Sequence, residues 1–242
     1  MLTKELIEKR INKFWGYGNL NSDIWFTGME EGFHGNLTDL ENRFNRTKDK
    51  SVIDLQDGMT NVQDHMKWFL PNSNIQRTWG KLIQILLTLK SNEKVTNGTI
   101  KEFQRKEFGR LNSNHCSLEF MPLPCRSIRK KDWFYNKFEI DYLETRKKYL
   151  DEIMPLRIKL FQDLIEKYNP KLIIVYSFSY LEKWKEIIGC NLSKKKNLYH
   201  CKKDKTDFFV IPHSTAHGMT NNDWDEIAQN IKQISGSLDE RT

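Results

Sequence analysis

Asp23-Ile-Trp-Phe-Thr-Gly28-Met-Glu-Glu-Gly32-Phe-His34 joins a short apolar run to a polar segment that two glycines bracket. Residues 24–27 predict a β-strand, and residues 28–32 are expected to form a loop after it. Glycine accepts backbone conformations and close ligand approaches that larger residues resist. The loop supplies two glutamates, and a phenylalanine and a histidine follow it, so the segment predicts an active site at a strand end.

A second polar cluster, Val210-Ile-Pro-His213-Ser-Thr-Ala-His217-Gly-Met-Thr220, lies near the C-terminus. It also follows an apolar strand and precedes a predicted helix. Open α/β sheets bind their ligands beyond the carboxyl ends of the strands. The two clusters therefore predict a binding site built from two strand-end loops.

Helices and strands are predicted to alternate along the rest of the chain. Helices are expected over residues 4–14, 78–90, 151–168, 180–188 and 223–234, and strands over 24–27, 116–121, 172–176, 198–201 and 208–211. Pro155 is expected to be tolerated only in the first turn of its helix, and Pro122 and Pro124 are expected to end the strand before them. The alternation predicts an α/β fold with a mostly parallel sheet covered on both faces.

The length of 242 residues and the apolar fraction of 38% suit one sizeable core, so residues 1–242 are assigned to a single domain. The polar segment 36–74 is too long for a plain connection. It is expected to be a partly helical insertion that shapes a substrate pocket. A second insertion, basic and aromatic, is expected around residues 124–150.

Lysine and arginine outnumber aspartate and glutamate by 39 to 32, and the net charge is +7. The excess is concentrated in residues 126–131, 194–196 and 202–205. This distribution favours binding of a polyanion. Solvated lysines on an ordinary protein surface would give a similar balance, so charge alone does not identify the partner.

The cysteine pattern predicts reduced thiols and a cytoplasmic location. The four cysteines lie far apart without a Cys-x-x-Cys pair, and the N-terminal segment lacks the apolar core of a signal peptide. Buried inert thiols are favoured over an iron–sulfur or zinc site, so no metal is expected. The longest apolar runs are too short to cross a bilayer, and no membrane partner is expected.

Three segments, taken in order, resemble the uracil-DNA glycosylase superfamily: Gly28-x-x-x-Gly32 after the first strand, Pro122-Leu-Pro124 after a middle strand, and His213-Ser-Thr215 after the last. The resemblance extends over residues 23–234 and rests on the order and spacing of short motifs. It implies a three-layer α/β/α sandwich around a mainly parallel four-stranded sheet whose strand ends hold a flipped-out nucleotide. DNA is the expected partner, with no cofactor and no obligatory protein partner.

By this resemblance, Glu30 stands at the acidic position that orients water and stabilises the cationic sugar as the glycosidic bond breaks. Glu31 replaces the family's common proline and is the alternative catalytic carboxylate; both could instead be exposed loop glutamates. Gly28 opens the motif beside the base. Gly32 replaces the tyrosine that blocks pyrimidine C5 substituents in the strict uracil enzymes, so larger bases would fit. Phe33 is expected either to stack on the extruded base or to pack in the core.

The C-terminal cluster resembles the family's His-Pro-Ser segment. His213 is expected to hydrogen-bond the base carbonyl and stabilise the charge on the departing base. Ser214 and Thr215 are expected to bind phosphate through hydroxyls and backbone amides. Met219 is expected to enter the minor groove as an apolar wedge that fills the vacated base stack.

The middle strand is expected to supply the residue that recognises the base. Glu119 is the nearest counterpart of the asparagine that pairs with uracil in the family. A carboxylate accepts a hydrogen bond from cytosine N4, whereas it repels uracil O4 unless it is protonated. Burial would raise the pKa of this carboxyl and allow it to share a proton with cytosine N3. In an alternative alignment, Asn114 recognises the base in place of Glu119, and the pocket is then expected to bind uracil.

The combination of Gly32 with Glu119 predicts a glycosylase for a C5-modified cytosine, such as the hydroxymethylated and glucosylated bases of some phage DNAs. A basic group beside the pocket is expected to bind phosphates: Arg126, Arg129, Lys130 and Lys131.

The alternatives are uracil excision in base-excision repair and a non-catalytic DNA-binding module. Zinc-dependent deamination is disfavoured because its Pro-Cys-x-x-Cys arrangement is absent. The two loops contain no lysine for a lyase step, so hydrolysis is expected to leave an abasic site.

Overall fold

The central feature of the computed structural model is an eight-stranded sheet with the order β3-β1-β4-β2-β5-β8-β7-β6. The structure describes residues 2–62, 64–127 and 133–236. The strands are β1 (Gly16–Gly18), β2 (Ile24–Gly32), β3 (Val52–Ile53), β4 (His115–Cys125), β5 (Leu172–Tyr176), β6 (Ser193–Lys195), β7 (Leu198–Lys203) and β8 (Thr206–Ile211). The central strands β4, β2, β5 and β8 are parallel. The predicted α/β class with a mostly parallel sheet is confirmed, but the predicted number of four strands is wrong.

The additional strands lie at the two edges of the sheet. On one side β1 pairs antiparallel with β4 and parallel with β3. On the other side β7 pairs antiparallel with β8, and β6 pairs antiparallel with β7. The edge strands β3 and β6 are two and three residues long, and β1 begins and ends with glycine. Such short segments show no alternation from which a strand could be predicted.

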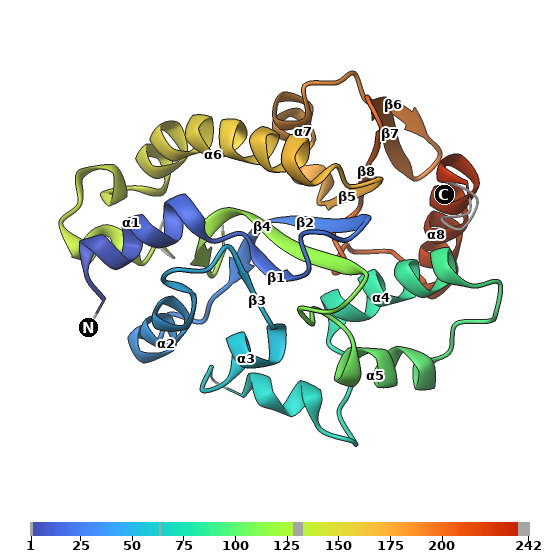
Figure 1. Ribbon diagram of the computed structural model, residues 1–242, viewed down its shortest axis with the longest axis horizontal. Coiled ribbons are helices and arrows are strands. Elements are labelled where there is room, and N and C mark those ends of the chain that lie inside the picture. The colour runs from blue at the N-terminus through green and yellow to red at the C-terminus, as the bar shows by residue number, and fades with distance from the viewer. Residues whose placement is uncertain (1, 63, 128–132, 237–242) are drawn as a thin grey trace.

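Helices pack on both faces of the central sheet. They are α1 (Lys4–Lys13), α2 (Leu37–Thr47), α3 (Leu55–Met59), α4 (Arg77–Lys90), α5 (Asn97–Lys106), α6 (Arg146–Tyr168), α7 (Leu181–Ile188) and α8 (Asn221–Ser235). Figure 1 shows α6 and α7 on one side of the sheet and α4 and α5 on the other. None of the helices within the described ranges has the length and apolar character needed to cross a membrane.

Neighbouring residues of the central strands contribute to two separate buried clusters. Trp25 and Ile173 belong to a cluster with side chains from α1, α6 and α7. Phe26 and Ile174, the next residue in each strand, belong to a cluster with side chains from α4, α5 and α8. Strands buried on both faces are expected to be continuously apolar, which explains the run in β5.

Strand β2 is longer than predicted and includes the glycine-bracketed segment. Its pairing with β4 continues to Gly32, opposite Cys125, with a shift of register between Glu30 and Gly32. The predicted loop over residues 28–32 is therefore wrong, because β4 supplies a hydrogen-bonding partner along that length. A shift of register redirects the side chains near it.

The two prolines of β4 do not end the strand, which corrects the prediction. Pro122 and Pro124 lie in the stretch where the register with β2 shifts. The ladder of hydrogen bonds between the two strands is irregular there, so a proline, which has no N–H to donate, can be accommodated. The carbonyl of Pro122 accepts a hydrogen bond from Nε of Arg10 at 2.8 Å, and that of Pro124 accepts one from the Tyr135 hydroxyl at 3.0 Å. The structure uses these carbonyls to hold α1 and the segment after β4.

Helix α6 begins at Arg146, so Pro155 lies in its interior and not in the first turn as predicted. An interior proline removes one helix hydrogen bond and costs about 3 kcal/mol. Contacts on the C-terminal side of the proline hold the helix in place. The buried guanidinium of Arg157 donates to the carbonyls of Phe120, Ile11 and Glu119 at 2.7, 3.0 and 3.2 Å.

The segment 36–74 contains α2, β3, α3 and a 3-10 turn over His65–Phe69. The side-chain oxygens of Asn36 and Asp54 accept backbone N–H groups at the starts of α2 and α3. These caps fix two short helices beside the carboxyl end of β2, where the segment contributes to the cavity described next.

Candidate functional site

A cavity of about 660 Å³ lies at the carboxyl ends of the central strands. Its lining includes six residues that the two sequence clusters and the middle strand predicted, Glu30, Glu31, Gly32, Phe33, Glu119 and His213, together with Arg126 of the predicted basic group. The segment 36–74 adds Arg43, Leu55, Met59 and His65 to the lining. The structure thus brings together residues from β2, β4, the loop after β8 and the insertion.

Glu30 has one occupied and one free carboxylate oxygen. Its Oε1 accepts a hydrogen bond from Nη2 of Arg146 at 2.5 Å. Its Oε2 is buried and has no hydrogen-bond partner among the described residues. Burial raises the pKa of Glu30 above its usual value, and the Arg146 charge opposes that rise. Glu30 can therefore still accept a hydrogen bond or a proton inside the cavity.

Glu31 is surrounded by partners on both oxygens. Oε1 accepts from the Tyr17 hydroxyl at 2.7 Å and meets Nη1 of Arg43 in an ion pair, while Oε2 accepts from Nη2 of Arg10 at 3.2 Å. Arg43 also pairs with buried Asp39. Burial alone would raise the pKa of Glu31, but the two arginines outweigh it and lower the pKa. The lowered pKa favours the ionised form of Glu31, whose contacts link β2 to β1, α1 and α2.

Glu119 is buried, and its Oε2 has no hydrogen-bond partner within the described residues. Burial raises its pKa well above the usual value, and the nearby charges of Glu31 and Glu30 raise it further. Gly28 makes this packing possible, since a Cβ there would lie 2.4 Å from the Tyr176 hydroxyl and 3.0 Å from Glu119 Oε2. Burial therefore favours the protonated form of Glu119, which has a proton to donate.

His213 is held by the residue two positions after it. The backbone N–H of Thr215 donates to Nδ1 of His213 at 3.2 Å, and the Thr215 hydroxyl lies 2.9 Å from the same atom. With Nδ1 acting as an acceptor, the proton of the neutral ring is assigned to Nε2. Burial lowers the pKa of His213, which favours the neutral form. The imidazole can thus donate a hydrogen bond from Nε2.

Gly32 and Phe33 differ in how much room surrounds them. Gly32 is exposed, and a Cβ at this position would meet no atom within 4 Å. Phe33 is only 2% exposed and packs edge-to-face on Phe134, with ring centroids 5.1 Å apart. Its core-packing interpretation therefore fits this structure, although the residue also lines the cavity. The structure therefore leaves open space beside Gly32.

Four predicted residues lie away from this cavity. Asn114 is exposed and immediately precedes β4, at the end of the strand opposite the cavity. Ser214 and Thr215 line a neighbouring cavity of about 470 Å³, and the Ser214 hydroxyl donates to Thr78 at 3.0 Å. Met219 packs, partly buried, against the cluster of α4, α5 and α8. Of the two alternatives, Glu119 lines the cavity and Asn114 does not.

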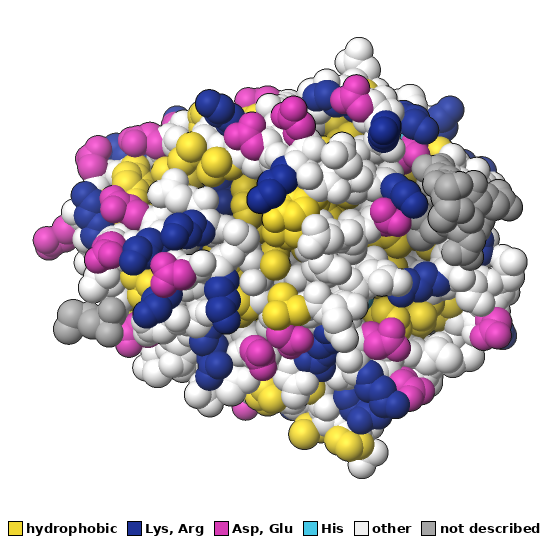
Figure 2. Space-filling view, viewed as in Figure 1, with side chains coloured by type: hydrophobic (Ala, Val, Ile, Leu, Met, Phe, Trp, Pro, Cys, Tyr) yellow, Lys and Arg dark blue, Asp and Glu magenta, His cyan; other side chains and the backbone are white. Residues whose placement is uncertain are grey.

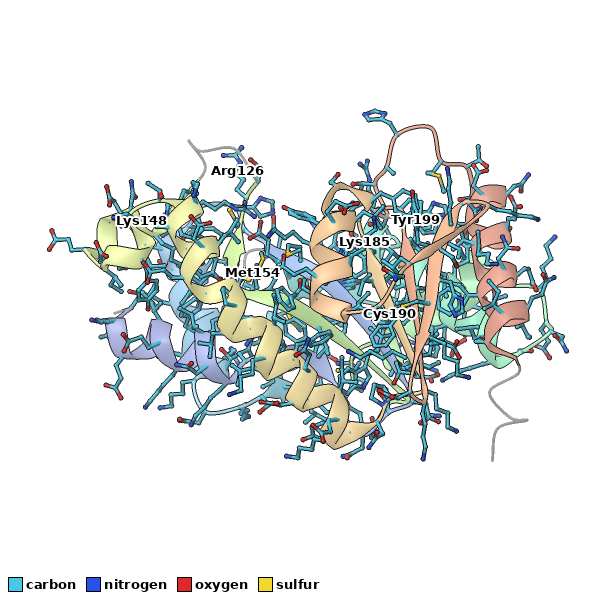
Figure 3. All side chains as sticks on the ribbon, turned by 90° about the horizontal axis from the view of Figure 1, so that it is seen from above. Arg126, Lys148, Met154, Lys185, Cys190 and Tyr199 are labelled. Carbon is cyan, nitrogen blue, oxygen red and sulfur yellow. The ribbon has the colours of Figure 1, made fainter. Side chains whose placement is uncertain are left out.

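The predicted basic group is described only in part. Arg126 is exposed and lines the cavity, whereas Arg129, Lys130 and Lys131 lie outside the described residues. Figure 3 shows Arg126 at the same edge of the molecule as the first turns of α6, where Lys148 lies. Figure 2 shows lysine and arginine interspersed with acidic side chains over the visible face. No single basic patch is seen on that face.

Several residues of the site were missed by the sequence analysis. Tyr176 ends a strand that was predicted with its present bounds, so the strand-end rule that selected Glu30 would have found it. Arg10 and Arg43 lie on the buried faces of α1 and α2, and an arginine at an apolar helix position is a signal of a buried ion pair. Arg146 lies within the basic insertion, where no pattern distinguishes it from its neighbours.

The arrangement supplies a proton acceptor, a neutral acid and a hydrogen-bond donor around one cavity. No group of three or more histidine, cysteine or acidic side chains in the described ranges is placed to hold a metal ion. Glu30, Glu119 and His213 can supply proton transfer and electrostatic stabilisation.

Comparisons with known proteins give no independent assignment. No protein-family model matches the chain, and the search of curated proteins returns no match. The resemblance to the uracil-DNA glycosylase superfamily therefore remains a prediction from the motifs, and the function has to be argued from the cavity.

Proposed function

We propose that the protein is a DNA glycosylase that hydrolyses the N-glycosidic bond of a flipped-out pyrimidine and leaves an abasic site. The observation that supports this best is the presence of Glu30, Glu119 and His213 around one cavity at the strand ends. The three groups differ in protonation, as attack on a sugar carbon and release of a base require. The proposal includes the three-layer α/β/α arrangement, DNA as the partner and a cytoplasmic location.

In the proposed reaction, the bond between sugar C1′ and base N1 breaks, and its electron pair leaves with the base. Ionised Glu30 stabilises the oxocarbenium-like sugar and orients a water whose oxygen bonds to C1′. The water gives its proton to Glu30. Neutral Glu119 donates its proton to cytosine N3, and Nε2–H of His213 donates a hydrogen bond to O2 of the base. The products are an abasic sugar and a neutral base.

The protonation of Glu119 changes the argument about base preference. A neutral carboxyl offers one donor and one acceptor, so it could pair with the edge of either cytosine or uracil. The repulsion expected between a carboxylate and uracil O4 is therefore removed. Discrimination then depends on N3, which accepts a proton in cytosine and already holds one in uracil. Cytosine remains the favoured base, and uracil excision is the alternative.

A C5-modified cytosine is the favoured substrate because of the space at Gly32. The exposed glycine leaves open space beside it, and the segment 36–74 contributes Arg43, Met59 and His65 to the lining of the cavity. A hydroxymethyl group or an attached sugar presents hydroxyls that polar side chains of the lining can hydrogen-bond.

The test is mass spectrometry of the bases released from matched DNAs that contain uracil, cytosine, hydroxymethylcytosine or glucosylated hydroxymethylcytosine. Wild type is expected to release the modified cytosine, and Glu30→Gln is expected to release very little. Release of uracil alone would keep the glycosylase assignment and overturn the cytosine preference. No release from any substrate would overturn the enzymatic proposal.

A non-catalytic DNA-binding module is the second candidate. The observation that favours it is the ion pair between Glu30 and Arg146, since this contact neutralises the proposed catalytic charge. Such a module would retain DNA in a salt-dependent manner without releasing a base. A filter-binding assay over a series of salt concentrations, run beside the base-release assay, separates the two candidates.

A further inference from the structure

The first residue of α6 reaches from the helix to the strand that bears Glu30. Nη2 of Arg146 donates to Oε1 of Glu30 at 2.5 Å and to the Tyr180 hydroxyl at 3.4 Å. The side chains of Arg146 and Glu30 are 12% and 9% exposed. On the basis of the proposed function, we infer that Arg146 is a positioning residue that keeps Glu30 ionised and fixes the orientation of its carboxylate, with Tyr180 holding the guanidinium.

The pairing occupies one carboxylate oxygen and leaves the other available. Arg146 contacts Oε1, whereas Oε2 has no hydrogen-bond partner among the described residues. A bidentate pair would engage both oxygens with the guanidinium, whereas this contact engages Oε1 alone. The end-on contact therefore stabilises the charge of Glu30 and still permits Oε2 to orient a nucleophile.

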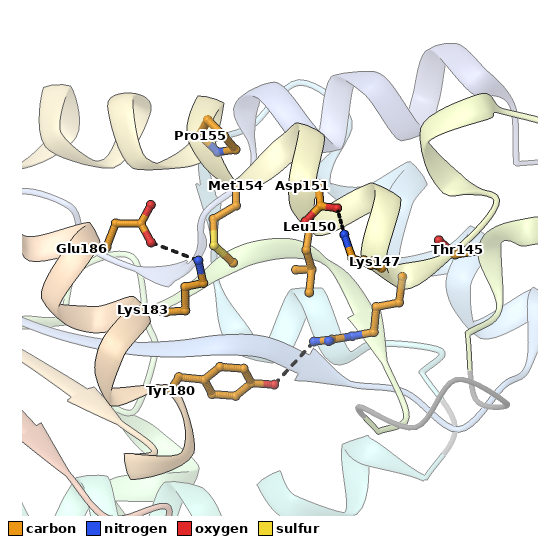
Figure 4. A pocket seen from close by; sticks show the side chains of 10 residues that line it. Thr145, Lys147, Leu150, Asp151, Met154, Pro155, Tyr180, Lys183 and Glu186 are labelled. Carbon is orange, nitrogen blue, oxygen red and sulfur yellow. Dashed lines mark hydrogen bonds and ion pairs between the residues drawn. The ribbon is translucent and has the colours of Figure 1, made fainter.

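Arg146 also lines a second cavity, of about 740 Å³, between α6 and α7. Figure 4 shows Leu150 and Met154 projecting from α6 toward Tyr180, whose hydroxyl makes the dashed contact with Arg146. Arg146 therefore lies between this cavity and Glu30. The low exposure of both side chains, 12% and 9%, strengthens their ion pair relative to one in water.

Several ionisable side chains lie near Glu30. They come from α6, β4, β2 and the turn before α7: Arg146, Tyr149, Cys125, Glu119, Glu31 and Tyr180. Arg146 is the cation of this set, and the others are neutral or anionic. Burial raises the pKa of Glu30, and Arg146 supplies the opposing effect. Removing that charge is therefore expected to raise the pKa further.

The test follows the ionisation of Glu30 directly, in protein labelled with carbon-13 at the glutamate carboxyls. The Glu30 resonance is assigned by its loss in Glu30→Gln. Arg146→Met is expected to move the titration midpoint upward by about one to three pH units, the range for loss of a cation next to a carboxylate. Arg146→Lys is expected to restore part of the shift, and Tyr180→Phe to move the midpoint upward by less than Arg146→Met.

The matched control is Lys147→Met, which removes a cation from the same helical turn. Lys147 pairs with Asp151, and its side chain is 85% exposed, so the Glu30 midpoint is expected to stay unchanged. An unchanged midpoint in Arg146→Met would overturn the inference. If Arg146→Met does not fold, equal midpoints in wild type, Arg146→Lys and Tyr180→Phe would do so.

The same variants separate this inference from the proposed function. If wild type releases base, the acidic limb of its pH–rate profile is expected to move upward in Arg146→Met by the shift seen in the titration. A moved titration with an unmoved rate profile would show that Glu30 is not the catalytic carboxylate. Absence of base release by wild type would overturn the reaction, while the titration would still decide whether Arg146 controls the charge of Glu30.

Discussion

Glu30 and Glu31 are neighbours in β2, yet their surroundings differ at every contact. Glu31 has three partners, Tyr17, Arg43 and Arg10, that engage both of its oxygens. Glu30 has Arg146 on one oxygen and no partner for the other within the described part of the chain. The pKa of Glu31 is lowered, whereas that of Glu30 is raised.

This contrast shows how two identical side chains, adjacent in sequence, can serve different purposes. A buried charge with complete partners resists protonation and connects the elements around it. A buried charge with an unused acceptor retains capacity for a substrate or a water, and such perturbed groups are concentrated at functional sites. We therefore assign the structural role to Glu31 and the chemical role to Glu30, and the following variants test that division.

The largest expected effect is a loss of stability in Glu31→Gln. The substitution leaves Arg10 and Arg43 buried without their anion, and breaking a buried pair in this way costs about 3–5 kcal/mol. Urea unfolding at neutral pH measures the change. Glu30→Gln is the matched control and should lose less, since it leaves one arginine that is 12% exposed without its anion, whereas Glu31→Gln leaves two that are 1% exposed. Equal losses in the two variants would contradict the division.

Glu30→Gln is expected to have the next largest effect, on base release. Removing one group that stabilises a transition-state charge commonly lowers the rate about 10²–10³-fold. Single-turnover assays with the preferred DNA measure this fall, and DNA binding measured in parallel should change little because the substitution keeps the shape of the side chain. If Glu30→Gln releases base at the wild-type rate, another residue of the cavity must carry the catalytic role.

Gly32→Tyr extends the test to the substrate. The position is exposed, and a Cβ added there would meet no atom within 4 Å, so the fold can accommodate the new ring. Its bulk would fill the space proposed for the C5 substituent, and release of modified cytosine should fall about 10–100-fold relative to a base without the substituent. Gly32→Ala is the control, with a small effect on both. If Gly32→Tyr lowered the release of modified and unmodified cytosine equally, the proposed orientation of the base, with C5 toward residue 32, would be contradicted.

The core of the fold was predictable because it follows from local patterns. The five apolar residues of β5 were predicted with the bounds that the structure has, and α4 differs from its predicted range by one residue. The edge strands and the continuation of β4 through its prolines were not predictable in this way. They depend on pairing between distant segments, and Pro122 is accommodated only because the register with β2 shifts there.

The sequence predicted those residues of the site that lie in or directly after a recognisable strand. Glu30 and His213 were selected by their positions at strand ends and Glu119 by the resemblance of the middle strand, and the structure places the three around one cavity. The protonation states of these side chains were harder to predict from the sequence, because the partners that shift their pKa values lie far away along the chain. Arg146 is 116 residues away from Glu30, and no local pattern relates the two. The expectation of a raised pKa for Glu119 is supported because it required burial alone.

Glu119 gives the smallest predicted effect and adds a third carboxyl to the comparison. Its folded pKa is raised, so the folded chain holds a proton that the unfolded chain has released. The free energy of unfolding should therefore fall as pH rises from the unfolded toward the folded pKa, by at most about 1.4 kcal/mol per pH unit. Glu31, with its lowered pKa, has the opposite sign, and its contribution is lost as pH falls through the folded value.

Glu119→Gln removes the titrating proton and keeps a donor and an acceptor. Its urea unfolding curves, collected from mildly acidic to mildly alkaline pH, should show a stability that rises relative to wild type as pH increases. Parallel pH profiles for the two proteins would mean that Glu119 titrates alike in the folded and unfolded chains. In that case the cavity would hold a carboxylate, and the proton required for release of cytosine would have to come from another group.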